Sequence, residues 1–98
     1  MISNMSIFFN NSEEKYNQEI KLAVSILKSL RIKANLTQMD VASKLDKPQS
    51  FVSKYEIGER RLDIIELKLV CEALGISLSD YVNILERKTE IESEQKIP

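Results

Sequence analysis

Histidine and tryptophan are absent from the 98 residues, cysteine occurs once, and glycine and proline occur twice each. The single cysteine, Cys71, can form neither an internal disulfide nor a zinc cage. It lies in the apolar stretch LKLVCEALG, so we interpret it as a buried, unreactive thiol in a reducing cytoplasm. Without histidine, a metal-ligand cluster or a glycine-rich phosphate loop, the chain is not expected to be an enzyme or to bind a metal or cofactor.

Long apolar runs are also missing. Nowhere do about 18 apolar residues follow one another, and no positively charged leader precedes an apolar stretch. We therefore expect a cytoplasmic protein that neither spans a membrane nor is secreted. With 43% apolar and 30% charged residues, the composition is that of one small globular domain.

The charges are unevenly distributed, although the net charge is only −1. Residues 20–61 carry nine Lys and Arg against four Asp and Glu, whereas residues 62–98 carry four against eight. A basic middle beside an acidic end indicates an interaction partner, although a solvated helix face could produce the same pattern.

Apolar residues recur at three- and four-residue steps, which predicts an all-α domain of five helices over residues 12–87. Residues 1–11 lack this period and are expected to form a flexible arm, and residues 88–98 a polar, frayed tail. Four of the helices begin at expected N-cap residues, namely Ser12, Thr37, Asp63 and Ser77. The remaining helix opens at or beside Pro48, where proline is tolerated, and ends near Ile57 before Gly58.

Two of these helices, 37–45 and 48–57, are separated by a short turn and form a helix-turn-helix pattern. Their mutual contacts are expected from four apolar residues, with Ala42 allowing close approach: Val41, Leu45, Val52 and Tyr55. When Val52 and Tyr55 face inward, Gln49, Ser50 and Lys54 lie on the outward edge. Such side chains form hydrogen bonds with base edges and phosphates.

The segments LKSLRIKANLTQMDVASKL and PQSFVSKYEIGERRLDIIELKLVCEALGISLSDYV resemble the Xre family of lambda-repressor-like helix-turn-helix domains. The likeness covers roughly residues 20–85 and implies a DNA-binding domain. It implies that Gln38 contacts the DNA backbone and that Gln49, Ser50 and Lys54 read base edges. It further implies phosphate contacts for the remaining members of the site, which are Ser53 and Arg60 or Arg61.

The resemblance also implies an ion pair between Arg31 and Glu56. The residues agree, because Arg31 lies four positions after Leu27, beside the apolar face, and a half-buried arginine needs a carboxylate. The turn departs from the family pattern, with Asp46 where glycine is usual and Pro48 where serine or threonine usually caps the helix.

Phe51 has three possible roles: packing at the domain edge, contact with a thymine methyl group, or simple exposure.

For the whole protein we expect a sequence-specific transcriptional regulator, a repressor, that binds double-stranded DNA. No small-molecule ligand is evident from the sequence. The alternative is an interaction or antitoxin-like module that uses the acidic C-terminal helices.

A homodimer is expected because one module of this size offers little contact area for tight, specific binding. Helix 77–87 is the candidate interface, since its apolar residues exceed what one inner face needs: Tyr81, Val82, Ile84 and Leu85. Ile84 is expected to be exposed in a monomer, unless it covers the arm of residues 1–11.

Overall fold

The computed structural model describes residues 2–95, and the side chains of residues 12–89. It contains five helices: α1 (Ile2–Lys33), α2 (Gln38–Leu45), α3 (Gln49–Glu56), α4 (Ile64–Ala73) and α5 (Leu78–Gln95). Residues 2–95 form no strand, so the expected all-α, five-helix architecture is confirmed.

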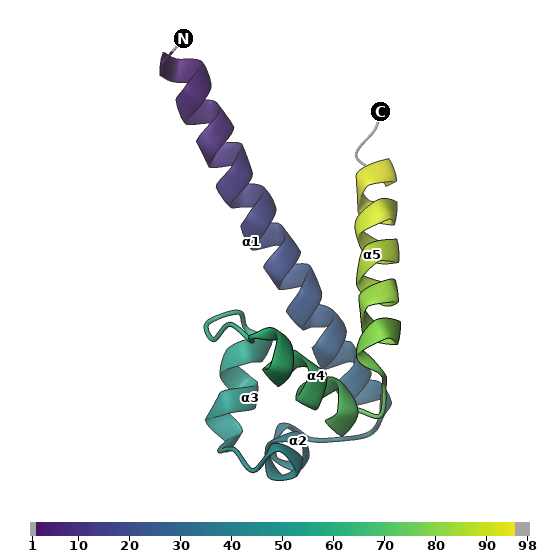
Figure 1. The fold of residues 1–98 in the computed structure, drawn as a ribbon. Coiled ribbons are helices and arrows are strands. Elements are labelled where there is room, and N and C mark those ends of the chain that lie inside the picture. Colours follow the sequence, from purple (N-terminus) through teal and green to yellow (C-terminus); the bar gives the residue numbers. More distant parts are fainter. Residues whose placement is uncertain (1, 96–98) are drawn as a thin grey trace.

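The short helices α2, α3 and α4 form a body against the C-terminal part of α1 (Figure 1). The two long helices α1 and α5 extend from this body toward the same side, where both chain ends lie (Figure 1). The molecule therefore measures 52 Å along its longest axis and 25 and 19 Å across it.

Reciprocal capping boxes fix the starts of two helices. The Thr37 hydroxyl accepts a hydrogen bond from the Asp40 main-chain N–H at 3.0 Å, and the Asp40 carboxylate accepts one from the Thr37 N–H at 2.8 Å. Asp63 and Glu66 repeat the arrangement at 2.7 and 3.0 Å. Each box satisfies two main-chain donors that a helix start leaves unpaired, so the predicted N-caps of α2 and α4 are confirmed.

Both outer boundaries differ from the sequence prediction. α1 begins at Ile2, so a non-helical arm over residues 1–11 is wrong for residues 2–11, and Ser12 lies inside the helix instead of capping it. α5 continues to Gln95, eight residues past the predicted end. Neither helix contains glycine or proline, and polar residues such as Lys, Glu and Gln are good helix formers.

One core joins the five helices. Its buried apolar residues are Ile26, Leu27, Val41, Ala42, Phe51, Val52, Tyr55, Val70, Cys71, Leu74 and Tyr81. The burial expected for Cys71 is confirmed, and it raises the pKa of the thiol to about 11. Among the described helices, none has both the length and the apolar content to cross a membrane.

Candidate nucleic-acid interface

The turn between α2 and α3 is built on a left-handed residue. Asp46 has φ 56° and ψ 45°, and the main-chain N–H of Lys47 donates to the Ala42 carbonyl oxygen at 2.9 Å. Aspartate adopts this conformation more readily than most residues, so it replaces glycine here. Pro48 then starts α3 in an extended conformation, with no side-chain cap.

The two faces of α3 differ sharply in exposure. Val52 and Tyr55 are fully buried, as predicted. Gln49, Ser50 and Lys54 are exposed. The structure thus brings the three candidate base-reading residues together on the outer edge of a helix whose inner face is held by the core.

Phe51 packs against the domain. It is only 8% exposed, and its ring lies edge-on to that of Tyr55 with centroids 5.7 Å apart. The guanidinium of Arg60 lies 5.0 Å from the ring centroid and the Lys47 ammonium 5.7 Å. Of the three roles considered for Phe51, the structure supports packing at the domain edge.

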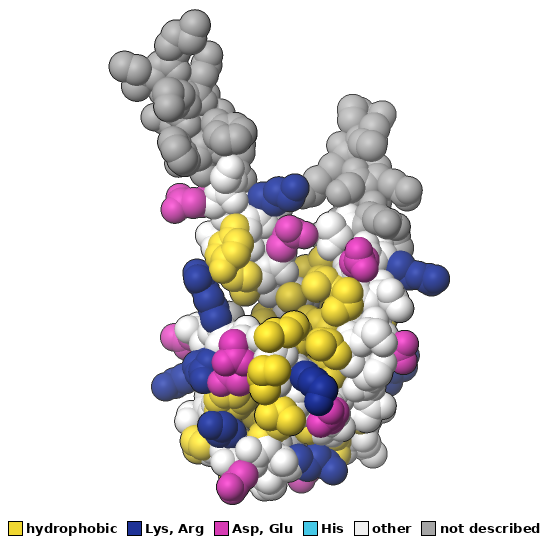
Figure 2. Space-filling model, viewed as in Figure 1, with side chains coloured by type: hydrophobic (Ala, Val, Ile, Leu, Met, Phe, Trp, Pro, Cys, Tyr) yellow, Lys and Arg dark blue, Asp and Glu magenta, His cyan; other side chains and the backbone are white. Residues whose placement is uncertain are grey.

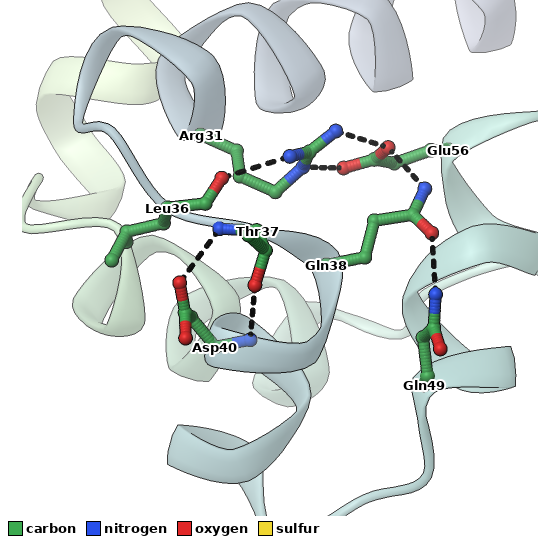
Figure 3. Close-up of polar contacts among 7 residues, drawn as sticks. All are labelled: Arg31, Leu36, Thr37, Gln38, Asp40, Gln49 and Glu56. Atoms are coloured by element: carbon green, nitrogen blue, oxygen red, sulfur yellow. Dashed lines mark hydrogen bonds and ion pairs between the residues drawn. The ribbon is translucent and has the colours of Figure 1, made fainter.

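Arg31 and Glu56 form a bidentate ion pair between α1 and the end of α3 (Figure 3). Arg31 Nε donates to Glu56 Oε2 at 2.7 Å and Nη2 to Oε1 at 3.2 Å, while Nη1 donates to the Leu36 carbonyl oxygen at 2.8 Å. The side chains are 11% and 2% exposed, respectively. The hydrogen bonds to Glu56 raise the pKa of the Arg31 guanidinium.

Gln38 connects this ion pair to the exposed start of α3 (Figure 3). Its Nε2 donates to Glu56 Oε1 at 2.9 Å, and its Oε1 accepts from Gln49 Nε2 at 3.4 Å. Sequence reasoning assigned Gln38 a contact with DNA and missed both of these contacts. The partners lie 18 and 11 residues away, so only the packing of α2 against α3 brings them together.

The two candidate phosphate-contacting arginines lie in different environments. Arg60 donates to both carboxylate oxygens of Glu66, at 2.6 and 3.2 Å, and to the Arg61 carbonyl oxygen. This contact lowers the pKa of Glu66. The Arg61 guanidinium lies over the Tyr16 ring, 5.1 Å from its centroid. The pairing of Arg60 with Glu66 was not predicted from the sequence.

Ser53 is partly buried, and its hydroxyl donates to the Ser50 carbonyl oxygen at 3.2 Å.

Away from the α3 edge, apolar side chains gather over α4 and between α1 and α5 (Figure 2). On α4, Ile64, Ile65 and Leu69 are 62%, 61% and 46% exposed. No group of three or more His, Cys, Asp and Glu side chains in the described part of the chain could hold a metal ion.

Comparison with known proteins places this geometry in a family. The helix-turn-helix family model matches residues 27–81, which include the Arg31–Glu56 pair and the whole α2–turn–α3 unit. An Xre-family-like protein from Pseudomonas syringae pv. tomato str. DC3000 is 36% identical, with a TM-score of 0.76 over 82% of this chain and 98% of that one. The chain belongs to the Xre family of helix-turn-helix proteins.

Restriction-modification controller proteins are among its relatives. Control protein C.MunI from Mycoplasma sp. is 26% identical over 70 residues, which cover 71% of this chain and 95% of the relative. The C.Esp1396I controller, solved as a tetramer in complex with its natural 35-base-pair operator, is 25% identical. That match has a TM-score of 0.66 and covers 70% of this chain and 91% of the controller.

Proposed function

We propose that this Xre-family protein is a sequence-specific DNA-binding transcriptional regulator, a repressor, that places α3 in the major groove. The observation that carries the proposal is the exposed polar edge of Gln49, Ser50 and Lys54 on a helix anchored by its buried face. The major groove admits an α-helix, and amide, hydroxyl and ammonium groups match the donors and acceptors of base edges and phosphates. The controller proteins to which the chain is similar support this reading.

The proposed contacts divide into two classes. Gln49, Ser50 and Lys54 read base edges, while Gln38, Ser53, Arg60 and Arg61 bind the backbone. We assign the larger phosphate contribution to Arg61, because Arg60 is already paired with Glu66 whereas Arg61 lies on an aromatic ring. Base contacts supply sequence preference and phosphate contacts supply affinity that depends on salt.

A homodimer through α5 is part of the proposal, because two modules double the contacts and match a palindromic site. Tyr81 is 1% exposed and therefore belongs to the core rather than to an interface. Val82, Ile84 and Leu85 remain partly buried at its edge, and they are the candidate contact residues. Ile84 is thus less exposed in the single chain than the sequence suggested.

A second candidate function is a protein-interaction module. The exposed Ile64, Ile65 and Leu69 of α4 favour it, since these large apolar side chains could pack against a protein partner. Both functions could coexist on one chain, because α3 and these residues of α4 are separate surfaces.

Binding-site selection from random duplex DNA tests the proposal. The purified chain should enrich one motif, and its affinity should fall steeply as the salt concentration rises. A matched double variant, Gln49→Ala with Lys54→Ala, should lose the motif while keeping the helical circular dichroism spectrum of the wild type. If the wild type enriches no sequence and shifts no DNA at low salt, DNA binding is wrong and the interaction module is favoured.

A further inference from the structure

The hydrogen bonds that connect Arg31, Glu56, Gln38 and Gln49 have a fixed direction (Figure 3). As the ion-pair partner of Arg31, the Glu56 carboxylate can only accept hydrogen bonds. Gln38 must therefore turn its Nε2 toward Glu56 Oε1, where the distance is 2.9 Å. Its Oε1 is then left toward α3, and Gln49 can approach it only as a donor, as it does at 3.4 Å.

We propose that Glu56 is a positioning residue that sets the donor–acceptor orientation of Gln49 and thereby selects adenine over guanine at the base that Gln49 reads. This inference rests on the proposed function. Glu56 acts through Gln38 and not by contact with DNA. Glu56, at one end of the hydrogen-bond chain, is only 7% exposed, whereas Gln49, at the other end, is exposed to water. The buried carboxylate therefore sets the orientation of the exposed amide.

The base preference follows from the hydrogen-bonding groups of Gln49 that Gln38 does not use. One Nε2 hydrogen is used on Gln38, so the second hydrogen and the Oε1 acceptor remain. Adenine presents the N7 acceptor and the N6 amino donor in the major groove, which match this pair. Guanine presents N7 and O6, two acceptors, so the Gln49 Oε1 would face O6 without a hydrogen.

Reversal of both amides would exchange these preferences. If Gln38 turned its Nε2 toward α3, Gln49 would accept through Oε1 and expose only N–H donors to the groove. Such donors fit the two acceptors of guanine. The carboxylate of Glu56 excludes this reversed arrangement, because it would bring Gln38 Oε1 against another acceptor.

The test measures one ratio of affinities. Selection with the wild type gives the operator, and selection with Gln49→Ala identifies the position whose base preference depends on Gln49. Operators with adenine or guanine at that position are then titrated with each variant. The wild type should prefer adenine by about tenfold, within the range of a good bidentate base contact.

A substitution of Gln38 tests the connection and leaves the Arg31–Glu56 pair in place. Gln38→Met is similar in length but has no strong acceptor, so the adenine preference should fall below about twofold. Gln18→Met, the same exchange on α1, is the matched control and should leave the ratio unchanged.

Glu56→Gln tests the carboxylate itself and should also lose the preference, because a neutral amide can accept or donate. The exchange variant, Glu56→Gln with Gln38→Glu, keeps one carboxylate near Arg31 and should regain the preference. It carries the test if Glu56→Gln alone does not fold.

An unchanged adenine preference in both Gln38→Met and Glu56→Gln would overturn the inference. A loss of preference in the exchange variant equal to that in Gln38→Met would also overturn it, since the direction of the hydrogen bond would then be irrelevant. Absence of any motif in the wild-type selection would reject the proposed function, and the inference with it, so the two failures are distinguishable.

Discussion

Tyr81 of α5 donates a hydrogen bond of 2.7 Å from its hydroxyl to the main-chain oxygen of Ala23 in α1, across 58 residues of sequence. Tyr55 is equally buried, but its hydroxyl has no hydrogen-bond partner among the residues that the structure describes. The core therefore contains two buried tyrosines of the same size that differ in whether the hydroxyl is satisfied. A buried hydroxyl without a partner destabilises the fold, whereas a bonded one stabilises it.

Removal of the two hydroxyls should affect stability differently. Tyr81→Phe loses the link between α5 and α1 and should lower the free energy of unfolding by about 1 kcal/mol. Tyr55→Phe removes an unsatisfied group and should leave that free energy unchanged or raise it. Urea unfolding followed by circular dichroism measures both. Equal losses in the two variants would show that the Tyr55 hydroxyl is bonded in solution.

The Arg31–Glu56 pair should contribute far more to stability than the exposed Arg60–Glu66 pair. Arg31→Ala leaves the Glu56 carboxylate buried without its main partner, and the expected loss is about 3–5 kcal/mol. For a domain of this size the melting temperature should fall by more than about 10 °C. The Arg60 side chain is 42% exposed, so Arg60→Ala should have a much smaller effect. A thermal melt in which Arg31→Ala barely differs from the wild type would contradict a buried pair.

Features governed by neighbouring residues could be predicted from the sequence. The capping boxes of Thr37 with Asp40 and of Asp63 with Glu66 lie within one helical turn, and so their residue types alone indicate them. The left-handed conformation of Asp46 also fits its place in the turn, where the family usually has glycine, because aspartate adopts this conformation more readily than most residues. The burial of Val52 and Tyr55 needs only the helical period.

Features that depend on tertiary distance could not be predicted in the same way. The hydrogen bonds from Gln38 to Glu56 and from Gln49 to Gln38 require the relative rotation of α2 and α3, which the helical period leaves undetermined. The start of α1 lies earlier than predicted because Ser12 has the character of an N-cap, although nothing before it interrupts a helix. A favourable cap residue is compatible with a helix that continues through it.

Alkaline pH should destabilise the protein. Burial raises the pKa of the Cys71 thiol from its ordinary 9.0 to about 11, and it raises the pKa of the Tyr55 and Tyr81 hydroxyls above 10.0. The folded chain then binds more protons than the unfolded chain between these values, so the free energy of unfolding falls as the pH rises. The loss should begin near pH 9 and continue through pH 11.

Urea midpoints measured from pH 7 to pH 10.5 check this dependence. Cys71→Ala is the control, since it removes the thiol and should flatten the decline between pH 9 and pH 10 while the tyrosine contribution remains. An unchanged slope in Cys71→Ala would show that the thiol does not contribute.

Lys54 and Arg61 should affect DNA binding differently. Lys54→Ala should weaken binding and relax the base preference at one operator position, because we assign Lys54 to base edges. Arg61→Ala should weaken binding to operator and random DNA alike, and it should lower the slope of log affinity against log salt by about one. Titrations at several salt concentrations distinguish these outcomes. Equal losses on operator and random DNA in both variants would remove Lys54 from the base-reading set.

The last prediction concerns the proposed dimer and compares two apolar surfaces. Ile84 of α5 is partly buried at the core edge, whereas Ile65 of α4 is 61% exposed. If α5 pairs two copies, Ile84→Lys should give a monomer by sedimentation and Ile65→Lys should remain a dimer at tens of micromolar. The operator half-sites of the wild type should then lie about 34–36 Å apart, one turn of DNA.

Thermal melts of both variants are needed, because a charge at the core edge also reduces stability. A folded Ile84→Lys variant that still dimerises, beside a monomeric Ile65→Lys variant, would place the interface on α4. That result would also turn the exposed residues of α4 from a surface for a foreign protein into a surface for a second copy of this chain.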